Sequence, residues 1–119
     1  MLRAGEQVDR ATYEAALAER ARLLPAADAL LDGVDALLGP VVAFTSPVDT
    51  PVLASPDGEI EGLFTESADL TGQPAISLPC GHDADGLPVG LQLAGRRGGD
   101  ADLLAVAAVV ERALGGGAR

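Results

Sequence analysis

The 119-residue sequence contains no lysine and no tryptophan, and it has one cysteine, one histidine and three aromatic side chains. A single cysteine excludes a disulfide within the chain. The eight basic residues are all arginines, and with 18 acidic residues they give a formal net charge of −10. A field of this sign repels phosphate backbones and anionic lipid surfaces, so we expect neither nucleic acid nor membrane as a partner.

Long hydrophobic runs are missing as well. No apolar stretch approaches the length of a membrane span, and the first residues contain no apolar signal-peptide core. Because one unpaired cysteine also suits a reducing compartment, we expect a cytoplasmic protein. The length favours one domain over residues 1–119, with 115–119 as a frayed tail.

The N-terminal third has the pattern of a long helix. Asp9 is a good N-cap residue, and the helix is expected to end at Asp32-Gly33. One face of this helix collects residues at steps of three and four: Tyr13, Leu17, Arg20, Leu24, Ala27 and Leu31. Pro25 lacks an amide hydrogen and clashes with the preceding turn, so it predicts a kink or a break.

Three short strands and one further helix are predicted in the rest of the chain. The strands are expected at 34–38, 75–78 and 89–93, with the last two forming a hairpin. The helix is expected over 101–114, ended by Gly115. Its apolar face consists of Leu103, Val106, Ala107, Val110 and Leu114. A three-stranded sheet leaves edges that tend to find a partner, so self-association is one expectation.

Residues 41–71 lack a regular pattern. Pro47, Pro51 and Pro56 predict turns, and one short helix is possible within 61–70. Loops of this length are usually functional or depend on a partner.

Residues 70–81 hold the side chains of nucleophilic catalysis. Cys80 and His82 are close enough in sequence for a thiol–imidazole pair, which would make a small cysteine hydrolase. The alternative is favoured: Cys80 follows an apolar strand, where a free cysteine packs as a small hydrophobe. Ser77 lies within the same strand and is expected to satisfy a local backbone group.

Two further clusters could bind ions. His82, Asp83 and Asp85 are too few and too close for zinc, and no glutamate completes a calcium loop, so a solvated turn is favoured. Residues 95–99 place Arg96 and Arg97 before a helix, where an anion could bind. A turn with two surface arginines is favoured there, because no phosphate-loop motif is present. We therefore expect no metal and no cofactor.

Four segments carry a specific family pattern. They read FT at 64–65, DLTGQPAISLPCG at 69–81, GLPVGLQLAG at 86–95 and DADLL at 100–104. Together they resemble the C-terminal part of the amidase signature family, and VDALLGP at 34–40 is similar to the strand that precedes them. The resemblance implies an α/β class: the C-terminal segment of an α/β/α mixed-sheet fold, with about three short strands flanked by two helices.

The family hydrolyses amides with a serine nucleophile, a bridging serine and a lysine base. The lysine must lose its proton near neutral pH, and arginine does not. This chain has no lysine, no Gly-Gly-Ser-Ser run and no adjacent serine pair. We therefore expect no catalytic residue within it, and an inert chain when it is alone.

Two positions depart from the family pattern. Asp69 replaces the usual asparagine and calls for an arginine partner or relaxed constraint, and Gly39 replaces the usual threonine. The resemblance suggests Phe64, Asp69 and Thr71 as candidates for the wall of a substrate pocket.

The favoured function is the C-terminal part of an amidase that cleaves carboxamide C–N bonds. In this role the chain supplies sheet, final helix and part of the pocket wall, and its partner is an upstream amidase fragment. The alternative is a non-catalytic interaction module, or a homodimer, derived from the same fold.

Overall fold

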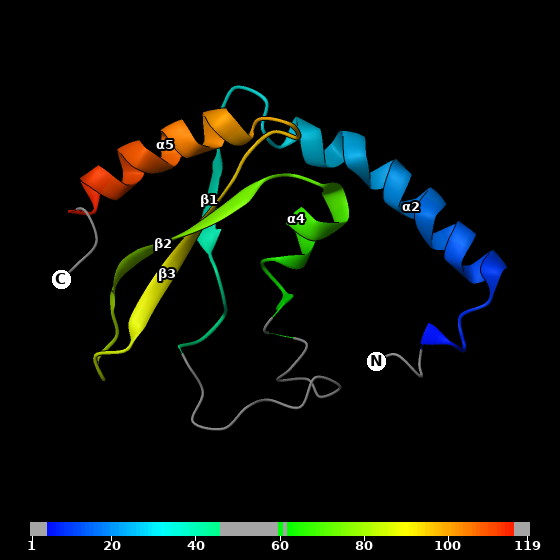
Figure 1. Cartoon of the computed structure of the whole chain (residues 1–119), viewed down its shortest axis with the longest axis horizontal. Helices are drawn as coiled ribbons and strands as arrows, with labels where there is room; N and C mark the ends of the chain where they lie inside the picture. Colours follow the sequence, from blue (N-terminus) through cyan, green and yellow to red (C-terminus); the bar gives the residue numbers. More distant parts are fainter. Residues whose placement is uncertain (1–4, 46–59, 61, 116–119) are drawn as a thin grey trace.

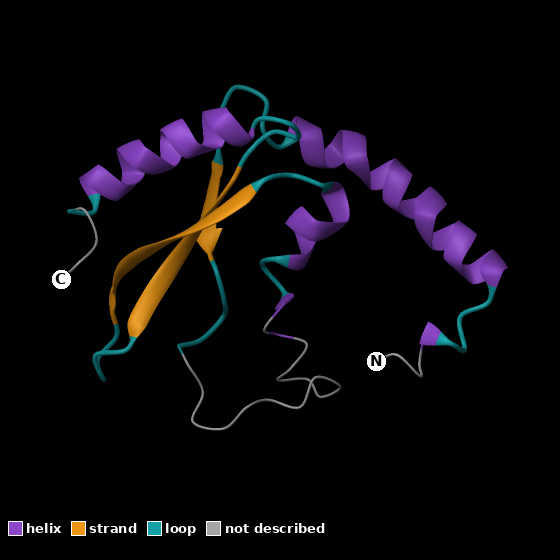
Figure 2. Ribbon diagram, in the orientation of Figure 1, coloured by secondary structure: helices purple, strands orange, loops and turns teal. Residues whose placement is uncertain are grey.

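The computed structural model of the chain describes residues 5–45, 60 and 62–115. Three strands form one sheet, two long helices arch across one end of it, and a short helix precedes the hairpin (Figures 1 and 2). In chain order the principal elements are α2 (Arg10–Ala29), β1 (Leu37–Pro40), α4 (Glu66–Thr71), β2 (Ala75–His82), β3 (Pro88–Ala94) and α5 (Asp100–Ala113). The predicted α/β class is confirmed.

The described sheet has the strand order β1-β3-β2, and both pairings are antiparallel. β3 is therefore central, and β1 and β2 are the two edges. Leu93 of β3 lies opposite Leu38 on one side and Ile76 on the other. Directly opposite side chains share a face of a sheet, so these three residues point to the same side.

β1 lies three residues later than the predicted strand at 34–38. The amide of Val34 donates to the carbonyl of Leu31 at 3.3 Å, so residue 34 still belongs to the turn after α2. The strand also continues through Gly39-Pro40, a pair that usually stops a strand.

The phase of the ladder explains why Pro40 fits. The amide of Gly95 donates to the carbonyl of Pro74 at 2.9 Å, and hydrogen-bonded and non-bonded pairs alternate from there. By this alternation Leu91 directs its backbone groups to β2, so Pro40, opposite Leu91, faces the outer edge. No ladder bond is lost at a proline in that position.

β2 is longer than the predicted strand, and the hairpin with β3 is confirmed. β2 runs to His82 because a register shift between Pro79 and Gly81 leaves Cys80 as an extra residue. Such a bulge lets the strand continue past an irregular position.

The core lies between the sheet and α5. Its buried members are Leu78 and Leu93 of the sheet and Leu103 and Ala107 of α5, with Val106 and Val110 packed partly against them. This is the apolar face predicted for the last helix. Gly115 follows the helix with a φ of 91°, a conformation that glycine adopts readily, and the predicted stop is confirmed.

α2 begins as predicted but packs differently. The side chain of Asp9 accepts a hydrogen bond from the amide of Thr12 at 2.7 Å, which confirms the N-cap. The helix runs through Pro25 without a break, so that prediction is wrong. Ala21, whose carbonyl loses its partner, is exposed, and water can bond that carbonyl.

None of the twenty residues of α2 is buried. Tyr13 and Leu17, on its predicted apolar face, are 58% and 43% exposed, whereas Leu31, just beyond the helix, is fully buried. The predicted apolar face is thus covered only at its C-terminal end.

The loop predicted over 41–71 contains α4, inside the range where a short helix was possible. Residues 46–59 and 61, and the end of the predicted tail at 116–119, lie outside the described residues. No helix in the described part is long and apolar enough to cross a membrane.

Candidate functional site

Ser77, Cys80 and His82 lie on β2, but the described contacts do not join them into a catalytic group. Cys80 is exposed at the bulge, and its thiol donates to the carbonyl of Val89 at 3.4 Å. His82 is exposed at the end of the strand. Among the described hydrogen bonds none links Cys80 to His82, and a reactive thiolate requires a nearby cation or imidazole. The geometry gives the cysteine-hydrolase alternative no support.

Asp83 organises the hairpin turn. One carboxylate oxygen accepts hydrogen bonds from the amides of Leu87, at 2.8 Å, and Asp85, at 2.9 Å. The bond from Leu87 is the main cause that lowers the pKa of Asp83. The carboxylate is thus occupied within the turn, and no group of three or more possible metal ligands occurs among the described residues.

Arg96 and Arg97 serve α2 rather than an anion. Arg97 donates two hydrogen bonds to the carboxylate of Asp28, one of them from Nε at 3.0 Å. Arg96 donates to the carbonyl of Leu31 and lies 3.7 Å from the carboxylate of Asp32. The loop before α5 therefore ties down the C-terminal end of α2, and the two guanidiniums already have acceptors.

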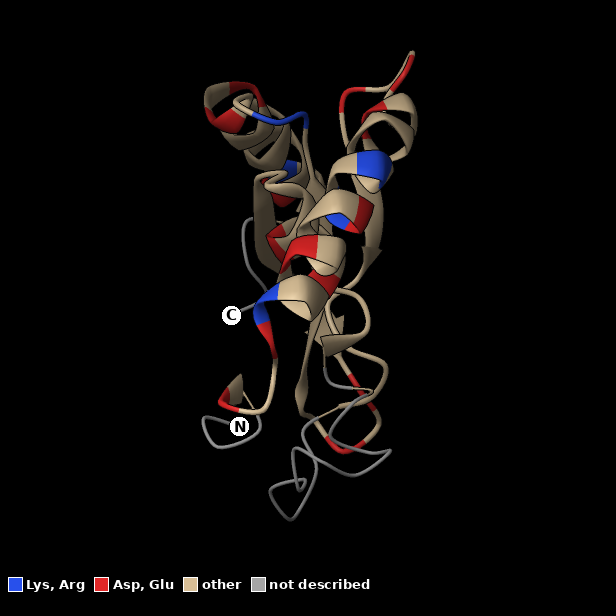
Figure 3. Ribbon diagram, turned by 90° about the vertical axis from the view of Figure 1, so that its right-hand side faces the viewer, with Lys and Arg blue, Asp and Glu red and all other residues tan. Residues whose placement is uncertain are grey.

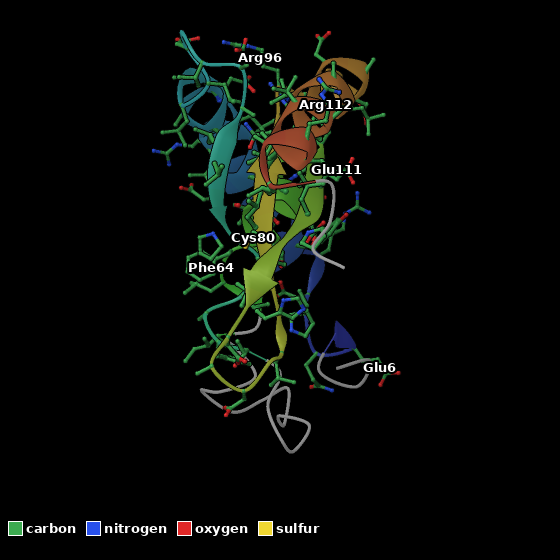
Figure 4. The ribbon with its side chains drawn as sticks, turned by 90° about the vertical axis from the view of Figure 1, so that its left-hand side faces the viewer. Glu6, Phe64, Cys80, Arg96, Glu111 and Arg112 are labelled. Atoms are coloured by element: carbon green, nitrogen blue, oxygen red, sulfur yellow. The ribbon has the colours of Figure 1, made fainter. Side chains whose placement is uncertain are left out.

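The ion pair of Arg97 is visible in the charge of its partner. The hydrogen bond from Arg97 lowers the pKa of Asp28, and the same contact raises the pKa of Arg97. Elsewhere on the described ribbon, acidic positions are spread over several elements and basic ones are few (Figure 3). Arg96 lies at one end of the molecule, well separated from Cys80 in the hairpin (Figure 4).

Phe64 is held against the sheet face opposite α5. The half-buried amide of Gln92, on β3, donates to the carbonyl of Phe64 at 2.8 Å. Gln92 lies opposite Ser77 in the register, so both side chains are on this face. Gly90 is on the same face, where an added Cβ would approach the hydroxyl of Ser77 to 3.2 Å. The sequence analysis missed Gln92, although a polar residue inside an apolar strand was a usable signal.

Asp69 and Thr71 lie on α4 and take other partners. The hydroxyl of Thr71 donates to the carbonyl of Ser67 at 2.6 Å, and the next polar residue, Gln73, donates to the carbonyl of Ala27 at 3.1 Å. Thr71 therefore belongs to the junction of α4 with α2. Asp69 is exposed in the first turn of α4, and no described arginine pairs with it. The described contacts do not gather Phe64, Asp69 and Thr71 around one point.

A hollow of about 240 Å³ lies where β1 ends and β3 begins. Apolar side chains and the Thr45 hydroxyl surround it; its lining is Pro40, Val42, Ala43, Phe44, Thr45, Pro88, Val89 and Gly90. Residues 41–45 were predicted only as loop, so this hollow could not be derived from the pattern. An apolar hollow with few polar groups is typical of a small-molecule pocket wall.

Comparison with known proteins identifies the wider context. A family model described as Amidase matches residues 1–104. The chain is 54% identical over 48 residues to a fatty acid amide hydrolase of Oryza sativa subsp. indica, covering 40% of this chain and 8% of that protein. It is 52% identical over 52 residues to a fatty acid amide hydrolase of Medicago truncatula, covering 44% and 9%. Over another 52-residue match it is 50% identical to a glutamyl-tRNA(Gln) amidotransferase chain of Koribacter versatilis, covering 44% and 11%.

Solved structures match nearly the whole chain. A 6-aminohexanoate cyclic dimer hydrolase in complex with substrate superposes with a TM-score of 0.78 and 30% identity, covering 92% of this chain and 26% of that one. A crystal structure of an amidase gives a TM-score of 0.78 and 35% identity, covering 96% and 27%. The chain thus spans about a quarter of these structures, and its matches span about a tenth of the curated relatives. With the family match over 1–104 and this agreement in fold, the chain belongs to the amidase signature family.

Proposed function

We propose that this chain supplies the C-terminal part of an amidase that hydrolyses carboxamide C–N bonds. Water is consumed in that reaction, and a carboxylic acid and an amine or ammonia are released. The chain contributes the sheet β1-β3-β2, α5 and part of the pocket wall, with the hollow at Phe44 and Thr45 as the described candidate. The observation that carries the proposal is a family match over 1–104 in a chain that spans about a quarter of the solved structures.

The proton-transfer residues come from outside these 119 residues. Family chemistry requires a lysine that can be neutral, and every basic residue here is an arginine. Cys80 and His82 do not replace it, since the thiol is bonded to a backbone carbonyl. The partner is therefore the upstream portion of an amidase fold, whether on the same polypeptide or on another, in the cytoplasm.

Fusion to a truncated relative tests this function. The 6-aminohexanoate cyclic dimer hydrolase would be produced without the quarter that this chain matches, with and without this chain joined to its end by a flexible linker. A linker keeps the local concentration of the chain in the millimolar range, so modest affinity suffices. We expect amide hydrolysis by the fusion and none by either part alone.

The controls separate the alternatives. Turnover of a simple carboxamide by the chain alone would contradict the proposal; its loss in Cys80→Ala would then establish the cysteine hydrolase. An inert fusion would also contradict the proposal, and a stable, cooperatively unfolding homodimer of the chain would support the interaction module instead.

The interaction module remains the second candidate because many large apolar side chains are exposed. Leu38, Leu30 and Leu63 are at least 60% exposed, and each is a possible contact for a protein partner. Sedimentation velocity over a range of concentrations distinguishes a homodimer from a monomer that requires the rest of an amidase.

A further inference from the structure

An uncovered apolar strip runs beside β1. We call it the β1 ledge and define it as Val34, Ala36, Leu38, Ala105 and Val106. Leu38 is 66% exposed and Val34 is 47% exposed. Ala36 and Val106 are half-buried and touch the edge of the core.

The ledge continues the layer that α5 covers. Leu38 lies opposite Leu93, whose side chain is buried under α5, so Leu38 points to the same side of the sheet. α5 packs on β2 and β3, the strands farther from the ledge. A hollow of about 320 Å³ separates Val34 from Ala105 and Val106. The apolar layer therefore stays open where it reaches β1.

The backbone of β1 is also available at this edge. Leu37 and Gly39 lie opposite Ala94 and Gln92, the β3 residues whose backbone groups point to β1 in the alternating ladder. Leu38 alternates with them, so its amide and carbonyl point away from β3. Among the described strands none pairs with this side of β1.

The opposite edge of the sheet is less suited to pairing. Pro79 lies near the middle of β2 and offers no amide to a neighbour, and the bulge at Cys80 interrupts the strand. Prolines and bulges protect an edge from further strands. On β1 the proline is the last residue, so the preceding positions remain free to pair.

We propose that the β1 ledge docks an extended strand from the portion of the amidase fold that lies outside these residues. This inference rests on the proposed function. Its occupant follows from coverage: the chain matches 26% of the hydrolase structure, which leaves about three quarters of that fold without a counterpart here. The added strand bonds to Leu38 and inserts apolar side chains, at alternate positions, beside Leu38 and Val106.

Charge adds a second requirement on that strand. Asp35 and Asp102 are exposed at the rim of the hollow beside Val34, and the nearby Arg96 is directed to Leu31 and Asp32. The two rim carboxylates favour a lysine or arginine near one end of the incoming strand. An apolar strand with a basic residue is thus the partner that fits this surface.

Binding of separate chains tests the ledge. The probe is the 6-aminohexanoate cyclic dimer hydrolase lacking its matching quarter, titrated calorimetrically with the wild-type chain, with Leu38→Lys and with Leu104→Lys. Leu104 is 59% exposed and lies outside the ledge, so it is the matched control. We expect Leu38→Lys to raise Kd at least about tenfold and Leu104→Lys to leave it nearly unchanged.

Amide hydrogen exchange supplies a second readout. The Leu38 amide should exchange rapidly in the free chain and slowly in the complex, because it gains a strand partner. A complex in which Leu38→Lys binds as tightly as wild type, or in which the Leu38 amide stays unprotected, overturns the ledge and leaves the proposed function standing. A wild-type chain that binds no probe, and whose fusion is also inert, overturns both.

Discussion

The two long helices of this chain have similar apolar spacing and very different environments. α5 buries Leu103 and Ala107 against the sheet, whereas none of the residues of α2 is buried. Tyr13 and Leu17 of α2 remain exposed although they follow the same period of three and four. An amphipathic pattern shows which face of a helix can pack, but burial depends on a surface that meets that face.

The largest expected effect is in the floor beneath α5. Leu93→Ala removes a side chain that is 2% exposed, and it should lower the free energy of unfolding by about 2–5 kcal/mol. Leu38→Ala is the matched control, because Leu38 lies directly opposite on β1 and is 66% exposed. Urea denaturation followed by circular dichroism measures both, and equal losses would show that the core is not under α5.

The helices themselves give the next effect. Leu103→Ala, on α5, should cost about 2–5 kcal/mol, whereas Leu17→Ala, on α2, should cost less than about 1 kcal/mol. The difference arises because Leu103 is 3% exposed and Leu17 is 43% exposed. Repeating the pair in the fusion protein sharpens the comparison: a larger loss for Leu17→Ala there would mean that the rest of the fold covers α2.

Local signals in the sequence predicted the parts of the fold that depend on near neighbours. Asp9 caps α2 through a residue three positions away, and α5 has its predicted face and its glycine stop. The break at Pro25 was wrong because an exposed helix tolerates one lost hydrogen bond. β1 was misplaced because its bounds depend on pairing with β3, more than fifty positions later in the chain.

The candidate site was harder to predict for the same reason. Gln92 holds Phe64 across 28 positions, and Gln73 reaches Ala27 across 46, and no periodicity encodes such contacts. The residue types of Cys80 and His82 suggested chemistry, yet the thiol is bonded to the neighbouring strand. The motif identified the family, whereas the contacts of each side chain required the structure.

The attachment of α2 gives a smaller, local effect. Arg97→Gln removes both hydrogen bonds to Asp28 and should speed amide exchange near the C-terminal end of α2 while leaving β3 unchanged. Arg22→Gln is the control, because it removes an exposed ion pair with Glu19 within α2 itself. If the two variants exchange alike, the contact between Arg97 and Asp28 does not hold the helix in place.

Acid should weaken the same attachment by the smallest amount. Arg97 lowers the pKa of Asp28 in the folded chain below the ordinary value of 3.8, so this contact stabilises the fold above that value. The stabilisation is lost as the pH falls through the lowered pKa, when Asp28 gains a proton. Asp9 and Asp83 also have lowered pKa values and titrate in the same window, so total acid sensitivity is not diagnostic. Asp28→Asn isolates the effect: between pH 6 and about pH 3, its α2 amide exchange, corrected for the intrinsic rate, should change less than that of wild type. Equal changes in the two proteins would assign the acid response to Asp9 and Asp83 and leave α2 indifferent to the charge of Asp28.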